Sequence, residues 1–171
     1  VIDYQKVLEQ HEKSDADITI VYRNQVVTDD LKDHMTIEVN EDGRVNKATL
    51  RAKVGEKASV AVNVWVINRR LLQGLLVDAA ATGAKSFHRD VLFANVKSLK
   101  IYGYNYEGVY LHMNSMENYF KGNMLLLNDQ VRNELFGNQE KRIYTKVRDS
   151  APTRYGEEAI VQNSFIADGC E

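Results

Sequence analysis

Apolar positions along the chain recur at two different periods, one typical of helices and the other of strands. From Tyr4 to His11 they recur at helical spacing and predict a helix from about residue 3 to 13. The apolar run ITIVY, which begins at Ile18, predicts a short buried strand. Because helices that cover a sheet produce this alternation of periods, we expect an α/β fold.

The middle of the chain predicts a hairpin followed by a central strand. The segment MTIEV from Met35 alternates between apolar and polar residues and leads into the turn NEDGR at 40–44. From Val60 to Ile67 the valines alternate with other residues and no charge interrupts the run. Both faces of such a strand are expected to be covered.

Three polar residues mark the starts of further helices. Asn68, Ser86 and Ser115 each precede apolar residues at helical spacing and are expected N-caps. A last short helix is expected around Val131 to Phe136.

An aromatic-rich segment lies between the last two of these capped helices. The run LKIYGYNY from Leu99 predicts a strand, and GVYLH from Gly108 is expected to continue it in extended form.

The end of the chain carries two six-residue units, IVQNSF from Ile160 and IADGCE from Ile166. Each has an aliphatic residue first and a small residue fifth, which is the spacing of a parallel β-helix. A single coil of such a helix cannot bury its own interior, so we expect further coils beyond this sequence. Val1 is not an initiator methionine, and the chain is expected to be a piece of a longer protein.

These patterns predict three regions. Residues 1–137 form part of an α/β domain, residues 138–157 form a polar linker that contains Pro152, and residues 158–171 form the first turn of a truncated β-helix domain.

Composition narrows the possible functions. The 22 Lys and Arg residues nearly balance the 24 Asp and Glu residues, so no basic field for nucleic acid or an anionic membrane is expected. No run is apolar enough to span a bilayer, and the single Cys170 excludes an internal disulfide. No GxSxG, P-loop or HExxH motif is present. A cytoplasmic location is expected.

Five segments have a specific order and spacing: NYFKGNMLLL, IYTKVRDSAPTRYGEEA and NSFIADGCE, together with DYQKVLEQHEKSDADITI and VNEDGRV upstream. They resemble the glucose-1-phosphate adenylyltransferase family, also called ADP-glucose pyrophosphorylase. The resemblance covers essentially the whole chain. It implies the C-terminal half of a nucleotidyltransferase domain, Rossmann-like with a mixed sheet, followed by the first hexads of a left-handed parallel β-helix.

The resemblance also implies a reaction, in which ATP and glucose 1-phosphate give ADP-glucose and pyrophosphate with the help of Mg²⁺. In the family two carboxylates hold the metal, and this chain begins after the first of them and after the Gly-rich nucleotide loop. His112 aligns with the second, and imidazole is a poor ligand for Mg²⁺. No catalytic residue and no bound metal are therefore expected in this chain.

The family's sugar-phosphate strand, which resembles FVEKP, aligns with residues 48–52. Arg51 stands where the family has a lysine that holds the phosphate, and it keeps the positive charge. Leu50 replaces a carboxylate. On the next strand Asn63 replaces a glycine whose backbone approaches the sugar. Arg51 and Asn63 are the candidate substrate-binding residues, although Arg51 also suits a surface ion pair.

Two functions follow from these departures. In the favoured one, the parent protein is a regulatory subunit, weak or inactive alone, that assembles with a catalytic glucose-1-phosphate adenylyltransferase subunit. In the alternative, the chain is the sugar-phosphate-binding half of an active enzyme. A hexapeptide-repeat acyltransferase is a third, weaker reading. The chain by itself is expected to be inactive and to self-associate through an exposed sheet edge.

Overall fold

The computed structural model describes residues 2–137, 143–144, 146 and 149–170. The chain divides into two compact units, a sheet unit of residues 2–107 and a C-terminal unit that begins at Gly108. The elements of the sheet unit are, in order, α1 (Tyr4–Lys13), β1 (Ile18–Val26), η1 (Asp29–Leu31), β2 (Thr36–Val39), β3 (Val45–Thr49), β4 (Lys57–Ile67), α2 (Arg69–Ala81), η2 (Phe87–Phe93) and β5 (Ile101–Asn105).

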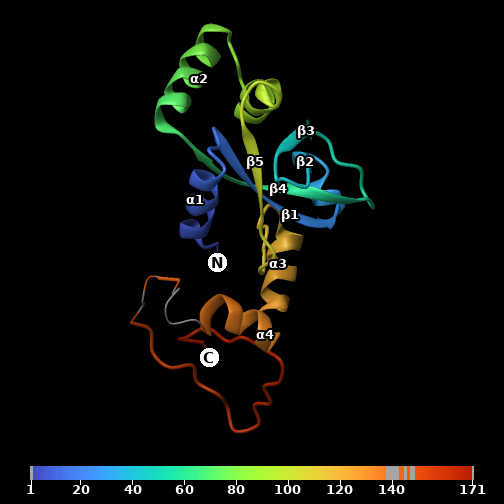
Figure 1. Ribbon diagram of the computed structural model, residues 1–171. Helices are drawn as coiled ribbons and strands as arrows, with labels where there is room; N and C mark the ends of the chain where they lie inside the picture. Colours follow the sequence, from blue (N-terminus) through green and yellow to red (C-terminus); the bar gives the residue numbers. More distant parts are fainter. Residues whose placement is uncertain (1, 138–142, 145, 147–148, 171) are drawn as a thin grey trace. The chain divides into compact units, whose positions relative to one another are not determined.

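The five strands form one mixed sheet in the order β3-β2-β4-β1-β5 (Figure 1). Strand β1 runs parallel to β5 and antiparallel to β4, with Ile18 opposite both Ile101 and Ile67. The expected hairpin is β2 with β3, and β4 is the central strand, as predicted. The expected α/β class with a mixed sheet is therefore confirmed.

The hairpin turn approaches the outer strand β5. Gly43, at φ +86°, supplies the left-handed turn conformation that glycine favours. Its carbonyl accepts a 2.9 Å hydrogen bond from the N–H of Gly103. A side chain at Gly103 would meet the ring of Tyr22 at 2.7 Å, so the absence of a Cβ there permits the close packing.

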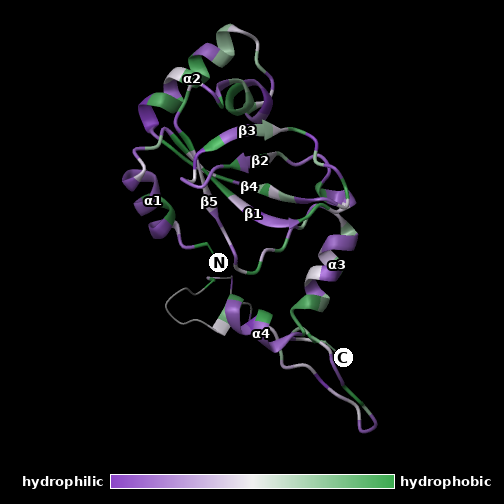
Figure 2. Cartoon of the chain, turned by 45° about the vertical axis from the view of Figure 1, so that its right-hand side comes forward, coloured by the Kyte–Doolittle hydropathy of each residue, from purple (hydrophilic) through white to green (hydrophobic). Residues whose placement is uncertain are grey.

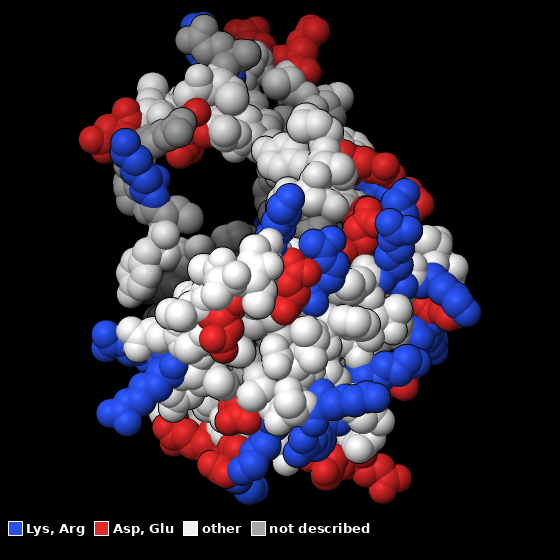
Figure 3. Space-filling model, turned by 90° about the horizontal axis from the view of Figure 1, so that it is seen from above, with Lys and Arg blue, Asp and Glu red and all other residues white. Residues whose placement is uncertain are grey.

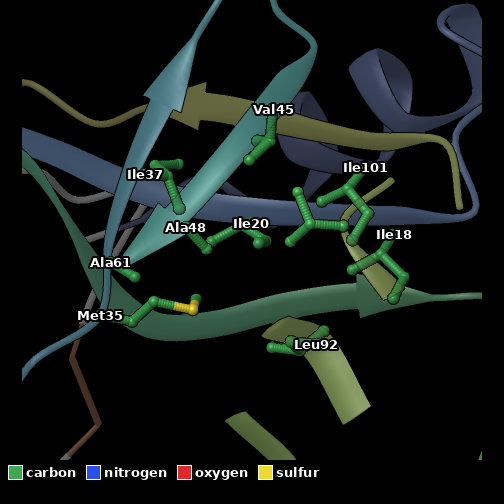
Figure 4. Close-up of a cluster of buried hydrophobic side chains, with 10 residues drawn as sticks. Ile18, Ile20, Met35, Ile37, Val45, Ala48, Ala61, Leu92 and Ile101 are labelled. Atoms are coloured by element: carbon green, nitrogen blue, oxygen red, sulfur yellow. The ribbon is translucent and has the colours of Figure 1, made fainter. Parts of the chain in front are cut away.

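The main core lies on one face of the sheet (Figure 4). Ile18 and Ile20 from β1 meet Ile101 from β5 and Leu92 from η2, and all four are fully buried. Burying a side chain of this size contributes about 1.5–3 kcal/mol. A smaller cluster of Val27, Leu31 and Val60 forms a second buried group.

The predicted caps are present. The Asn68 side chain accepts a 3.0 Å hydrogen bond from the N–H of Arg70 at the start of α2. Ser86 accepts from Arg89 at 3.4 Å, although the element that it begins is a π-helix rather than an α-helix. Spacing alone did not reveal this wider winding.

The C-terminal unit contains α3 (Met116–Leu125), α4 (Asp129–Arg132) and the π-helix η3 (Asn133–Gly137). Ser115 caps α3 by accepting a 3.1 Å hydrogen bond from Asn118, as predicted. Residues 108–112, which were expected to continue in extended form, are not assigned to a strand.

Described residues between 149 and 170 form turns and no strand. The hydrogen bonds within this segment include one of 2.9 Å from the Arg154 N–H to the Cys170 carbonyl and one of 2.6 Å from Thr153 Oγ1 to the Ala167 carbonyl. Cys170 is exposed. The β-helix stays a prediction, and much of the linker proposed for 138–157 lies outside the described residues.

Hydropathy differs between elements (Figure 2). Helix α1 is mostly hydrophilic and buries only Val7, whereas β1 begins with a fully buried run, Ile18–Val21. Within the described residues, no helix combines the length and apolar character that crossing a bilayer requires.

Candidate functional site

Arg51 lies beside a depression of about 570 Å³ in the sheet unit. The depression is formed by the β2–β3 hairpin, the segment from Arg51 to Lys53 and the start of β4. The hairpin register places Thr36 opposite Thr49 and Glu38 opposite Lys47, so polar side chains gather at this part of the sheet.

Basic side chains outnumber acidic ones around the depression. Its lining includes Lys47, Arg51, Lys53 and Lys57 but only two acidic residues, Glu38 and Glu56. Lys47 pairs with Glu38 at 2.6 Å and Lys53 with Glu56 at 3.6 Å. These pairs are exposed and contribute little to stability.

Arg51 and Lys57 make no ion pair within the part of the chain that the structure describes. The surface-pairing interpretation of Arg51 therefore finds no partner there. A guanidinium with five N–H donors can bind a phosphate in bidentate fashion. The depression is consequently suited to a small anionic ligand.

Hydroxyl groups also line the depression beside Arg51. Thr36, Thr49 and Ser59 contribute them, and the Ser59 hydroxyl donates a 2.7 Å hydrogen bond to the Asn24 side chain. Hydroxyls both donate and accept, so they can bind the polar groups of a sugar phosphate as well as its charge. On the face shown in Figure 3, basic and acidic side chains are interspersed rather than gathered into one field.

Asn63, the second candidate, does not line this depression. It lies in β4 where the register with β1 shifts, and its φ of +59° is left-handed. Asparagine adopts this conformation more readily than most residues other than glycine. Where the family pattern has glycine, this chain therefore keeps a backbone that glycine would favour and adds a side chain to it.

The Asn63 side chain contacts His88, a residue that the sequence alone does not mark as part of a site. His88, in η2, contacts the Asn63 side-chain oxygen through its Nε2 at 3.1 Å. The His88 ring also packs edge-on against Trp65, with centroids 4.7 Å apart, and burial lowers its pKa. No local pattern in the sequence reveals a contact between two residues that lie 25 positions apart.

Trp65 packs against the main core and lies 5.6 Å from the ring of Phe87. His11 likewise has a partner for one ring nitrogen, with Nδ1 2.8 Å from the hydroxyl of the buried Thr19.

His112 belongs to the C-terminal unit, and its ring stacks on Tyr110 with centroids 6.0 Å apart and planes inclined by 12°. Burial raises the pKa of Tyr110. Among the described residues, no three His, Cys, Asp or Glu side chains gather as a candidate metal centre. The donors described here do not fit Mg²⁺, which prefers several oxygen ligands.

No protein-family model matches the chain. Curated relatives do match it, and they are proteins of glycogen biosynthesis and glucose-1-phosphate adenylyltransferases. These similarities support the resemblance to the adenylyltransferase family.

Three relatives illustrate the match. The glycogen biosynthesis protein GlgD of Bacillus subtilis (strain 168) is 26% identical over 169 residues, which are 99% of this chain and 39% of that protein. The glucose-1-phosphate adenylyltransferases of Clostridium novyi (strain NT) and Thermomicrobium roseum are 22% and 24% identical, over 99% of this chain and 44% and 40% of their own lengths. The chain thus spans about two fifths of the relatives it matches.

Proposed function

We propose that this chain is part of a glycogen-biosynthesis protein of the glucose-1-phosphate adenylyltransferase type and acts in a regulatory subunit. One supporting observation is the similarity over 99% of the chain to proteins with those names, GlgD among them. The basic depression at Arg51 is the other. In this proposal it binds the phosphate of a sugar phosphate, and the parent protein assembles with a catalytic subunit.

The chemistry of this site is binding rather than bond making. Arg51 neutralises the phosphate, Lys57 adds a second positive charge, and nearby hydroxyls contact the sugar. Among the described residues, no cluster of three or more His, Cys, Asp or Glu side chains is present that could hold Mg²⁺. A regulatory role is compatible with this set of groups because sensing a ligand requires affinity without turnover.

Titration of glucose 1-phosphate into the chain by calorimetry tests the site. We expect Arg51→Ala to weaken binding by about tenfold or more, as expected for loss of a charge-assisted bidentate contact. Arg69→Ala, which removes the same side chain from the exposed start of α2, is the matched control and leaves affinity unchanged. Equal affinity in both variants contradicts the assignment of Arg51.

The alternative is an active enzyme of which this chain is the sugar-phosphate half. The relatives named as adenylyltransferases favour it, and so does the positive charge kept at Arg51. ADP-glucose formation by the full-length protein, alone and mixed with a catalytic subunit, distinguishes the two. Strong turnover alone supports the enzyme, whereas stimulation only in the mixture supports the regulatory subunit.

The same proposal covers the C-terminal residues and the location of the protein. Residues 158–171 begin a left-handed β-helix that further coils complete, and the protein works in the cytoplasm, where a glycogen-synthesis role requires it. Mg²⁺ belongs to the reaction of the catalytic partner rather than to this chain.

A further inference from the structure

Two carboxylates are among the groups that line the depression beside Arg51. Glu38 belongs to β2, and Glu56 immediately precedes β4. Because a carboxylate and a phosphate are both anions, each of these side chains lowers the affinity of the depression for a phosphate. A second role in ligand binding is therefore expected only for a carboxylate that the fold itself does not use.

Glu56 has a structural role. It forms an exposed ion pair with Lys53, three residues earlier, and its N–H donates a 3.3 Å hydrogen bond to the Lys53 carbonyl. Its own carbonyl accepts a 2.9 Å bond from the Val27 N–H. Glu56 thus belongs to the turn that leads into β4, and its carboxylate is accounted for within that turn.

Glu38 is positioned by the hairpin strands instead. The register places it opposite Lys47, and the neighbouring pair on the same face of the hairpin is Thr36 with Thr49. Successive residues on one face of a strand are about 7 Å apart, so the two pairs form a continuous row of polar side chains. Arg51 comes two residues after Thr49, and all five residues line the depression. The chain therefore passes from the Glu38–Lys47 pair, along the threonines, to Arg51.

One carboxylate oxygen of Glu38 is available to a ligand. Its Oε1 accepts a 2.6 Å hydrogen bond from Lys47 Nζ, and no other described residue bonds to the carboxylate. The Glu38 side chain is 60% exposed. Sugar hydroxyls donate hydrogen bonds, and a bond to an ionised acceptor is roughly twice as strong as one between neutral groups. Lys47 meanwhile offsets the negative charge, which limits the repulsion of a phosphate bound nearby.

We propose that Glu38 is the residue that selects the sugar, an inference that rests on the proposed function. Arg51 holds the phosphate, and the sugar extends from there over Thr36 and Thr49. Its hydroxyls donate to the Glu38 carboxylate, which Lys47 orients. The class of ligand is then a phosphate monoester of a polyhydroxylated sugar, and bare phosphate binds less tightly.

Calorimetry with two ligands, glucose 1-phosphate and inorganic phosphate, tests the role of Glu38. Glu38→Gln removes the charge that accepts the sugar hydroxyls, so the affinity for glucose 1-phosphate should fall by about fivefold or more. The same substitution removes a repulsion, so the affinity for inorganic phosphate should not fall. A change by the same factor for both ligands overturns the inference.

Two further variants provide the controls. Glu41→Gln removes a carboxylate from the turn of the same hairpin, outside the depression, and should leave both affinities unchanged. Glu56→Gln removes the other carboxylate of the depression and should raise both affinities, because only repulsion is lost. Circular dichroism checks that each variant keeps the native fold.

Failure of the proposed function gives a different result. If the unsubstituted chain binds neither ligand, or if Arg51→Ala binds both as tightly as the unsubstituted chain does, the phosphate site is wrong and the role of Glu38 falls with it. If Arg51→Ala weakens both ligands while Glu38→Gln leaves the affinity for glucose 1-phosphate unchanged, the phosphate site stands and only the role of Glu38 is rejected.

Discussion

The sheet unit and the C-terminal unit differ in how they use apolar side chains. Every buried hydrophobic residue in the described chain lies between Val7 and Ile101. Beyond Gly108, helix α3 leaves Met116 81% and Phe120 64% exposed, and Ile160 is 85% exposed. One unit therefore contains its own core, whereas the other presents helices and turns whose apolar faces lack cover among the described residues.

This contrast shows that helical propensity and capping are sufficient for a local element but not for a core. Helix α3 has its serine cap and an exposed ion pair between Lys121 and Glu117, yet Gly122 is the only residue of the helix that is buried. Most helical stability in proteins comes from packing of an apolar face. Burial should consequently contribute little to the stability of helix α3.

The largest expected effect is the loss of unfolding free energy on truncating a core side chain, compared with an exposed one in the C-terminal unit. Ile20→Ala removes a fully buried side chain from the main core and should lower the free energy of unfolding by about 2–5 kcal/mol. Met116→Ala, at a side chain that is mostly exposed, should change it by less than about 0.5 kcal/mol. Urea unfolding followed by circular dichroism measures both, and comparable losses would show that Met116 is buried in solution.

A smaller effect tests the strained position inside the sheet. Asn63→Val places a β-branched residue at φ +59° and should cost about 1–3 kcal/mol. Asn63→Gly relieves the backbone while losing only the contact with His88, so its stability should lie close to that of the unsubstituted chain. Thermal unfolding of the two variants compares them, and a glycine variant as unstable as the valine variant would assign the cost to the lost hydrogen bond.

The smallest effect is a pH dependence at His88. Burial lowers its pKa from 6.5, so the folded state favours the neutral ring. The preference for the neutral ring stabilises the fold fully at pH values above the pKa that His88 has in the unfolded chain. This stabilisation decreases as the pH falls below that pKa, because the unfolded chain then binds the proton more readily. The free energy of unfolding, measured at several pH values, should decrease less with falling pH in His88→Gln than in the unsubstituted chain. An identical pH profile in both proteins would place the dependence elsewhere.

Much of the sheet unit was predictable because its signals are local. The strand at Ile18, the hairpin around 40–44 and the Asn68 cap each depend on neighbouring residues, and all three are present. The candidate site was predictable only in part. Arg51 was found through the resemblance, which aligns it with the family's sugar-phosphate lysine, but the lysines and hydroxyls around it come from three separate segments.

By itself, the sequence determined the order of elements, the α/β class and the resemblance that identifies related proteins, since periodicity, caps and motifs are properties of neighbouring residues. Only the tertiary structure decided that Asn63 adopts a left-handed conformation and that His88 contacts its side chain. Both depend on which distant segments meet. A linear pattern does not specify such contacts, because strand pairing and side-chain packing are settled jointly by the whole unit.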